Sequence, residues 1–338
     1  MLTELGSSFP SHCEHGRDRA AYHHDQSKAD VSLMGGVEIV EDIELRRSAW
    51  TPTPSVRVYP PADHLRGYVT FYYVVESPGP VTDFLYPEWG NVRFAVTGEW
   101  HVEMPGCYLP DPQIDALFGP TDRCGTVTAT GGKMVGFGMT PLGWNRLIGS
   151  DASAMANRVR PLGAELGICS SELGISFAPG TADEVGVSKL DDLLTRLVSR
   201  RPPEPGLMIK TDRVLRTRPA NVPAFAAAVG VPLRTLHRLC LRTFGFAPKR
   251  LLRRQRFLDT LGHVRSAVGE SLKASLDPTY NDLPHFYRDF RDFMGMSPQV
   301  YHRANRQLMA QAAAAQVEAG VTLSFQLPPQ PAGRASLQ

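Results

Sequence analysis

NVPAFAAAVGVPLRTLHRLCLRTFG, the stretch from Asn221 to Gly245, predicts two short helices separated by a tight turn. The first helix would bury Phe225 and Val229 and present the small Ala226 to the second helix. Gly230 lies where the turn needs a backbone that adopts positive φ without strain. A small residue four positions before such a glycine, between two buried apolar residues, is typical of a helix-turn-helix.

The second helix of this segment would bury Leu236 and Leu239. Its outward side chains are polar and could reach base edges or phosphates: Arg234, Thr235, His237, Arg238 and Arg242. A plain helical hairpin has the same apolar spacing and is the alternative. The polar outward face favours contact with DNA.

The pattern recurs 50 residues further along the chain. Identical or similar residues pair Leu233 with Leu283, Leu236 with Phe286, Arg238 with Arg288, Gly245 with Gly295, Phe246 with Met296, Pro248 with Pro298 and Arg253 with Arg303. In the second copy Phe286, Phe290 and Phe293 form one apolar stripe. Asp282 is the expected N-cap of that helix, and Pro284 is tolerated in its first turn. Two tandem helix-turn-helix units explain this repeat better than chance does.

Two quoted stretches carry a family resemblance: RTLHRLCLRTFGFAPKRLLRRQRF and YNDLPHFYRDFRDFMGMSPQVYHR resemble the C-terminal domain of AraC/XylS-type transcription regulators. The resemblance covers about a hundred residues. It implies two recognition helices in successive major grooves on one face of DNA, joined by a long helix. Here that helix is expected from Pro248 to Val264, with four leucines inward: Leu251, Leu252, Leu258 and Leu261.

The resemblance implies a sequence-specific DNA-binding regulator that is not an enzyme and needs no cofactor. Beyond the first recognition helix, the expected DNA contacts are Arg250, Arg253, Arg254, His285, Tyr287 and Arg288. The arginines at 250, 253, 254 and 256 are spaced too densely to be core. We expect their exposed members to touch phosphates and to steepen the salt dependence of binding.

The chain departs from the family pattern at several positions. Pro232 stands where the family usually has a serine that caps the first recognition helix, and it offers no side-chain hydrogen bond. In the second unit Thr279 replaces the usual glycine and Pro278 comes just before the turn. Leu283 stands where glutamine is common, so it can contact a thymine methyl group but cannot recognise a donor and acceptor pattern.

Residues 37–163 show short runs of β-formers between glycines and prolines, which predict an antiparallel sandwich or barrel. The clearest runs are Tyr68–Glu76, Asn91–Gly98 and Gly125–Thr130. This part resembles, more weakly, the cupin-like sensor domains that precede such DNA-binding units. The expected fold class is therefore α+β, with a β-rich cupin-like sensor domain followed by an all-α domain with two helix-turn-helix units.

The expected domain boundaries follow from changes in composition. They are a disordered tail at 1–36, the sensor domain at 37–163, a helical connector at 164–206, the DNA-binding domain at 207–306 and a C-terminal tail at 307–338. In the connector Leu190, Leu194 and Leu197 form an apolar stripe on a helix from Asp183 to Arg200. That stripe packs on the sensor domain or forms a dimer contact.

Eight aromatic residues could line a ligand pocket or serve as core: Tyr68, Phe71, Tyr72, Tyr73, Phe84, Tyr86, Trp89 and Trp144.

Charge and composition are consistent with this division. The 338 residues carry a net charge of only +2, but 207–306 hold 18 Lys and Arg against 7 Asp and Glu. A basic block joined to an acidic remainder indicates a polyanionic partner. The five cysteines are scattered without CxxC spacing, which argues against disulfides and zinc and for a reducing compartment. Without an apolar stretch for a signal peptide or a membrane span, we expect a cytoplasmic protein that does not bind membranes.

One alternative class remains from the sequence. Glu99, His101 and Glu103 would share one face of a strand and could hold a metal, as in cupin enzymes, although the HxH pair of those enzymes is absent. The alternative function is a cupin-type metalloenzyme with a helical assembly domain. For the regulator, double-stranded DNA is the expected partner. RNA polymerase, a small-molecule effector and the choice between monomer and homodimer stay open.

Overall fold

The computed structural model describes residues 53–108, 115–163, 166–167, 170–178, 180–266, 280 and 282–321. The polar tail expected at 1–36 and the end of the tail expected at 307–338 lie outside these residues. No helix in the described ranges is long and apolar enough to cross a membrane.

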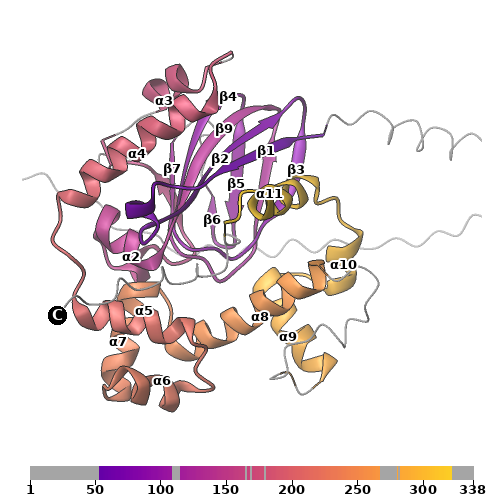
Figure 1. Cartoon of the computed structure of the whole chain (residues 1–338). Helices are drawn as coiled ribbons and strands as arrows, with labels where there is room; N and C mark the ends of the chain where they lie inside the picture. Colours follow the sequence, from indigo (N-terminus) through magenta and orange to yellow (C-terminus); the bar gives the residue numbers. More distant parts are fainter. Residues whose placement is uncertain are drawn as a thin grey trace, which may run out of the picture. The chain divides into compact units, whose positions relative to one another are not determined.

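Two antiparallel sheets form the first part of the described chain (Figure 1). The larger is 6-stranded with the order β1-β2-β9-β4-β7-β10, and the smaller is 4-stranded with the order β3-β8-β5-β6. Their strands are β1 (Ser55–Tyr59), β2 (Val69–Ser77), β3 (Val81–Leu85), β4 (Asn91–Thr97), β5 (Trp100–Met104), β6 (Cys107–Tyr108), β7 (Ala116–Phe118), β8 (Gly125–Ala129), β9 (Gly132–Met139) and β10 (Val159–Pro161). The three strands predicted most clearly from the sequence correspond to β2, β4 and β8.

Strand β2 is covered on both faces, which explains its nearly continuous apolar sequence. Tyr72 and Val74 belong to the core between the larger sheet and the helices that cover it. Phe71, Tyr73 and Val75 point the other way, into the core between the two sheets. The larger sheet is therefore the middle layer of this part of the molecule.

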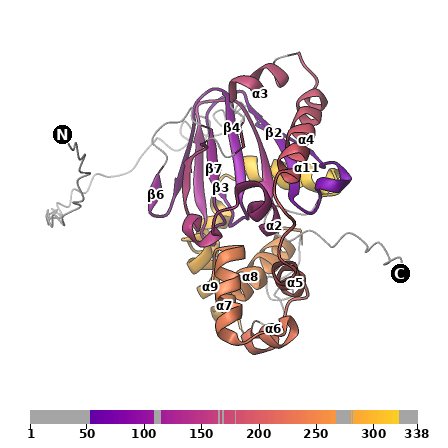
Figure 2. The same cartoon turned by 90° about the vertical axis from the view of Figure 1, so that its left-hand side faces the viewer.

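Helices α2 (Pro141–Gly143), α3 (Ser170–Ser176) and α4 (Asp183–Ser199) come next, and α3 and α4 lie over the outer face of the larger sheet (Figure 2). In α4, Leu190 and Leu194 are fully buried and Leu197 is nearly so. All three belong to the same hydrophobic core as strand residues of the larger sheet. The apolar stripe of the connector is thus used in packing on the β-rich part, one of the two uses expected.

The remaining helices form the C-terminal part: α5 (Gly206–Arg216), α6 (Val222–Val229), α7 (Leu233–Phe244), α8 (Pro248–Ser266), α9 (Leu283–Met294), α10 (Pro298–Arg303) and α11 (Gln307–Glu318). Helix α8 occupies the place expected for the joining helix. Of its four leucines, Leu251, Leu258 and Leu261 are buried, and Leu252 is half-buried.

Helix α11 lies in the segment at 307–338 that the sequence analysis assigns to the C-terminal tail. It returns to the β-rich part and packs against β1 and β3. Leu308, which is 2% exposed, enters the core between the two sheets. The backbone N–H of Met309 donates a hydrogen bond of 2.8 Å to Oδ2 of the buried Asp83. This helix therefore completes the β-rich part from the far end of the chain.

The eight aromatic residues do not line one pocket. They are spread over four separate cores, and of the eight only Phe71, Tyr73 and Tyr86 line the cavity between the sheets and α11. Tyr86, besides lining this cavity, belongs to the core of the second C-terminal helical unit, and Trp89 belongs to the core of the first. Both come from residues 86–90, the loop between β3 and β4, so this one loop contacts both units.

Candidate nucleic-acid interface

The first helical unit has the geometry that its sequence predicts. The side chain of Asn221 caps α6 by accepting a hydrogen bond of 2.9 Å from the N–H of Ala224. Phe225 and Val229 are buried, and Gly230 ends the helix with φ at 79°. A positive φ of this size favours glycine, because a Cβ atom would strain the backbone. The turn between α6 and α7 thus depends on Gly230.

Helix α7 presents a polar face to solvent. Arg234, His237, Arg238 and Arg242 are exposed and Thr235 is half-buried, so all five predicted DNA contacts on this helix are at least partly accessible. On its inner face Leu236 and Cys240 are buried, whereas Leu239 is only half-buried. The N-cap residue Pro232 makes no side-chain hydrogen bond, as expected for proline.

Helix α9 repeats this arrangement in the second unit. Asp282 caps the helix, its Oδ1 accepting a hydrogen bond of 2.7 Å from the N–H of His285. Phe286, Phe290 and Phe293 form the buried stripe that the sequence predicts. Phe257 of α8 lies against all three, with its ring centroid 5.0 Å from that of Phe293. The helix expected before α9 falls at positions outside the described residues.

The predicted contact residues of the second unit differ in exposure. Tyr287 and Arg288 are exposed on α9. His285 is half-buried, and its ring packs edge-on against Tyr280 and lies 3.3 Å from a guanidinium nitrogen of Arg256. His285 is therefore the least accessible of the three.

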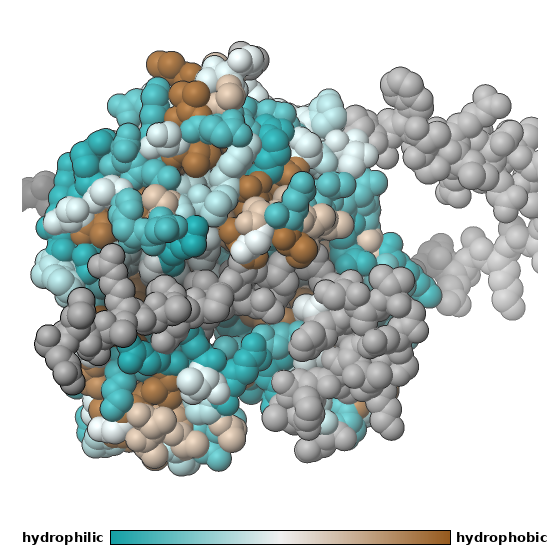
Figure 3. Space-filling view, viewed as in Figure 1, coloured by the Kyte–Doolittle hydropathy of each residue, from teal (hydrophilic) through white to brown (hydrophobic). Residues whose placement is uncertain are grey.

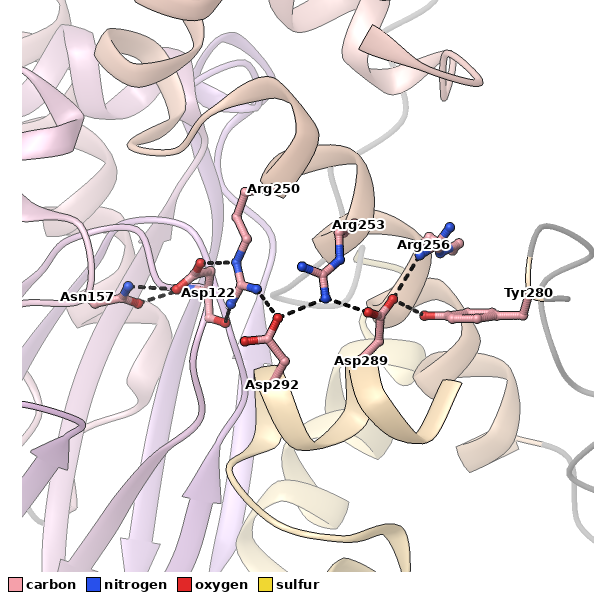
Figure 4. A network of polar contacts seen from close by, with 8 residues as sticks. All are labelled: Asp122, Asn157, Arg250, Arg253, Arg256, Tyr280, Asp289 and Asp292. Carbon is pink, nitrogen blue, oxygen red and sulfur yellow. Dashed lines mark hydrogen bonds and ion pairs between the residues drawn. The ribbon is translucent and has the colours of Figure 1, made fainter. Parts of the chain in front are cut away.

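The arginines of α8 form a network with carboxylates (Figure 4). Arg250 is bound by Asp122 of the β-rich part on one side and by Asp292 of α9 on the other. Arg253 contacts Asp289 at 2.6 Å and Asp292 at 2.9 Å. Helix α8 is thus connected through its arginines both to the β-rich part and to the second recognition helix.

Asp289 is the centre of the second half of this network. It accepts a hydrogen bond of 2.9 Å from Arg256 and one of 3.0 Å from the hydroxyl of Tyr280. Burial alone would raise the pKa of Asp289, but hydrogen bonds from Arg253 and Arg256 hold that pKa below its usual value. The carboxyl group is therefore ionised at neutral pH and compensates part of the positive charge on α8.

Arg254 has a different environment from the one that the sequence predicts. Its side chain is 1% exposed and lies over the indole ring of Trp89, with 4.1 Å from the guanidinium carbon to the ring centroid. Its Nε donates a hydrogen bond of 2.9 Å to the carbonyl oxygen of Thr121. Burial lowers the pKa of Arg254 to about 9, so the group stays charged at neutral pH. The predicted contact between Arg254 and a phosphate is therefore wrong, because the side chain is buried. The sequence argument that these arginines are too closely spaced to be core does not hold for Arg254.

Sequence reasoning missed a basic groove between the two helical units. The groove has a volume of about 750 Å³ and is lined by residues from the segment between α5 and α6, from the start of α6, from α8 and from α9. Its cationic or potentially cationic side chains are Arg218, Lys249, Arg253, Arg256, His285 and Arg288. Arg218 and Lys249 lie in the basic block but outside both recognition helices, which is why motif matching gave no signal for them.

The candidate metal site at β5 and the residue before it has little to support it. Glu99 and Glu103 are exposed and His101 is half-buried, as on a solvated strand face. Among the described residues, no group of three or more His, Cys, Asp or Glu side chains is placed to hold a metal ion.

Comparison with known proteins identifies one region of the chain. Residues 225–304 match the family described as "Helix-turn-helix domain". A sequence search of curated proteins found no match. Among solved structures, ToxT from Vibrio cholerae is similar at 11% identity, covering 73% of this chain and 95% of its own, with a TM-score of 0.37. The P21 crystal form of ToxT from Vibrio cholerae is similar at 11% identity, covering 74% of this chain and 97% of its own, with a TM-score of 0.39. The AraC-like transcriptional activator CuxR is similar at 15% identity, covering 67% of this chain and 92% of its own, with a TM-score of 0.26.

Proposed function

We propose that this chain, whose residues 225–304 match the helix-turn-helix family, is a transcription regulator of the AraC type that binds duplex DNA through two tandem units. One observation carries the proposal: α7 and α9 are equally long and each presents a polar face with an exposed arginine at the same position, Arg238 and Arg288. Such helices fit the major groove, where arginine binds O6 and N7 of guanine with both terminal nitrogens.

The basic groove is a second observation that supports the proposal. Two recognition helices in successive major grooves would bring the intervening phosphates against the surface between the units. Lys249, Arg253 and Arg256 line that surface. Because Arg253 and Arg256 are already hydrogen-bonded to Asp289, phosphates would compete with a carboxylate for them. Their net contribution to affinity would therefore be smaller than that of an uncompensated arginine.

We further propose that the β-rich part is a sensor that controls DNA binding. Its loop at 86–90 places Trp89 in the core of the first unit and Tyr86 in the core of the second. The Tyr86 hydroxyl lies 2.7 Å from that of Tyr301, and the N–H of Cys124 donates to the carbonyl oxygen of Phe293 at 2.7 Å. A small-molecule effector that shifts this loop would change the arrangement of both units, and RNA polymerase or a second copy of the chain would respond to it.

The test is binding of the full chain to duplex DNA over a range of salt concentrations. We expect affinity to fall steeply with salt, with a slope of roughly 0.9 in the log–log plot for each phosphate contact. Replacing Arg238 and Arg288 together by alanine should remove the preference for guanine at one base pair in each half of the site. The control is Arg213→Ala, which removes an exposed arginine from α5. A chain that binds no duplex DNA at low salt would contradict the proposal and favour the metalloenzyme with a helical assembly domain.

A further inference from the structure

The two described recognition helices share an apolar residue at the same position. Helix α7 begins at Leu233 and α9 begins at Leu283, and each helix ends 12 residues later at a glycine in the left-handed conformation. The register of the two helices is therefore identical, and their first residue is leucine in both.

Leu233 is unusual among leucines because it is 54% exposed. Its neighbours on the outer face, Arg234 and His237, are polar and exposed. Leu283 occupies the equivalent place and is half-buried. Helix packing does not require an apolar side chain at a position that is half open to solvent in one copy.

Isolated apolar residues on a surface are common and carry no meaning alone. Figure 3 shows a largely hydrophilic surface with small separate hydrophobic patches, one of them over α6. The repetition is what distinguishes these two leucines. Other outward positions differ between the helices, since Arg234 is matched by Pro284 and His237 by Tyr287. Among the outward residues, the leucine and the arginine five positions later are retained.

We propose that Leu233 and Leu283 each recognise a thymine through its C5-methyl group, so that the operator contains two related half-sites. This inference rests on the proposed function. The thymine methyl is the one apolar group that unmodified bases present in the major groove, and aliphatic side chains contact it. Residues near the N-terminus of a recognition helix are those that reach base edges. Both leucines are at that end.

The shared arginine fixes the layout of each half-site. Five residues of an α-helix advance by about 7.5 Å, which corresponds to roughly two base pairs of B-DNA. A thymine contacted by Leu233 and a guanine contacted by Arg238 should therefore lie about two base pairs apart. Leu283 and Arg288 have the same spacing, so the second half-site should contain a thymine and a guanine at the same offset.

The experiment uses deoxyuridine, which pairs like thymine but lacks the methyl group. The full chain selects sequences from a random duplex library, and the enriched site is then synthesised with thymine or with uracil at each position in turn. We expect uracil to weaken binding about fourfold at one position in each half-site, the factor for losing burial of one methyl-sized group. Uracil elsewhere should have no effect beyond error.

Single variants assign each effect to its leucine. Leu233→Ala should remove the thymine-to-uracil difference in one half-site only, and Leu283→Ala in the other only. The control is Leu207→Ala, which truncates a leucine of α5 that is 37% exposed. It should leave both differences unchanged.

The outcomes separate the two claims. Sequence-specific binding with equal affinity for thymine and uracil duplexes overturns the inference and leaves the proposed function intact. A methyl effect that persists in both leucine variants also overturns it. Absence of duplex DNA binding overturns the proposed function, and the inference with it.

Discussion

Arg238 and Arg254 belong to the same basic block but have opposite surroundings. Arg238 is exposed on the outer face of α7, whereas Arg254 lies under Trp89 with its Nε on a backbone carbonyl group. A charged side chain in such a position persists only when its hydrogen bonds and packing offset the cost of desolvation. One arginine is available for recognition and the other supports the fold.

Arg238→Ala should lower affinity for the preferred operator by about 1–3 kcal/mol and relax preference at one base pair. The reason is the loss of a two-pronged contact with guanine. Fluorescence anisotropy on the operator and on single-base variants measures both effects. A uniform loss on every sequence would instead make Arg238 a phosphate contact.

Arg254→Ala should act on stability instead of recognition. Truncation leaves a cavity beside Trp89 and an unpaired carbonyl oxygen on Thr121, so we expect a loss of about 2–4 kcal/mol in the free energy of unfolding. Denaturant unfolding measures the loss, with Arg213→Ala as the surface control. The slope of DNA affinity against salt concentration should stay at the wild-type value. A flatter slope would show that Arg254 contacts a phosphate.

At the scale of elements, α8 and α9 are held together by an aromatic cluster on one side and by the carboxylate network on the other. Phe257 supplies the centre of the first and Asp289 the centre of the second. Asp289 is 1% exposed, so its charge depends on the arginines that face it. The ionisation of Asp289 therefore contributes to holding α9 against α8.

Acid should loosen this contact. A carboxyl group whose pKa is lowered in the folded state contributes stability above its unfolded pKa of about 3.9, and the contribution disappears as the pH falls through the folded value. Wild type should therefore lose stability below about pH 4 more steeply than Asp289→Asn, which is less stable at neutral pH. Thermal unfolding between pH 7 and pH 3 gives the comparison, with Glu103→Gln as an exposed control. Parallel curves for wild type and Asp289→Asn would refute it.

Local pattern predicted the elements whose partners are close in sequence. The spacing of Phe286, Phe290 and Phe293 was sufficient for α9, because the stripe itself determines the buried face. The position of Arg254 was not predictable, since its partners Thr121 and Trp89 lie far away in the chain. The packing of helix α11 on the β-rich part was not predicted, for a related reason. Its alanine-rich sequence has a weak apolar face. Its position depends on contacts with β1 and β3, which are distant in the chain and leave no pattern in the local sequence.

At the scale of the molecule, Arg250 connects the β-rich part to the second unit through Asp122 and Asp292. Asp122 is in turn held by Asn157, whose Nδ2 donates a hydrogen bond of 2.6 Å to it. A carboxylate of the β-rich part thus occupies an arginine that the sequence predicts to contact DNA. DNA and the β-rich part would then compete for the same guanidinium group.

Asp122→Asn should weaken that competition. We expect tighter binding to duplex DNA and a log–log salt slope that is steeper by up to roughly 0.9, the contribution of one further phosphate contact. Titrations at several salt concentrations measure the slope, and Asp63→Asn removes an exposed carboxylate of the β-rich part as the control. An unchanged slope together with unchanged affinity would show that Arg250 lies away from the phosphates.

Leu308→Ala should destabilise the β-rich part although the residue lies beyond the second helix-turn-helix unit. The side chain is buried among residues of both sheets, so its truncation should cost about 2–5 kcal/mol. Val317→Ala, on the exposed side of the same helix, is the matched control. Equal thermal stability of the two variants would mean that α11 is not part of that core.

The position of α11 also sets the order in which this protein can mature on the ribosome. The strands are synthesised early, but the core between the sheets waits for Leu308, which emerges only after both helix-turn-helix units have been translated. Until then the apolar residues that Leu308 covers between the sheets are exposed, and exposed apolar surface is bound by chaperones and proteases. We therefore expect a chain cut between α10 and α11 to unfold more readily than the full chain and to be degraded faster.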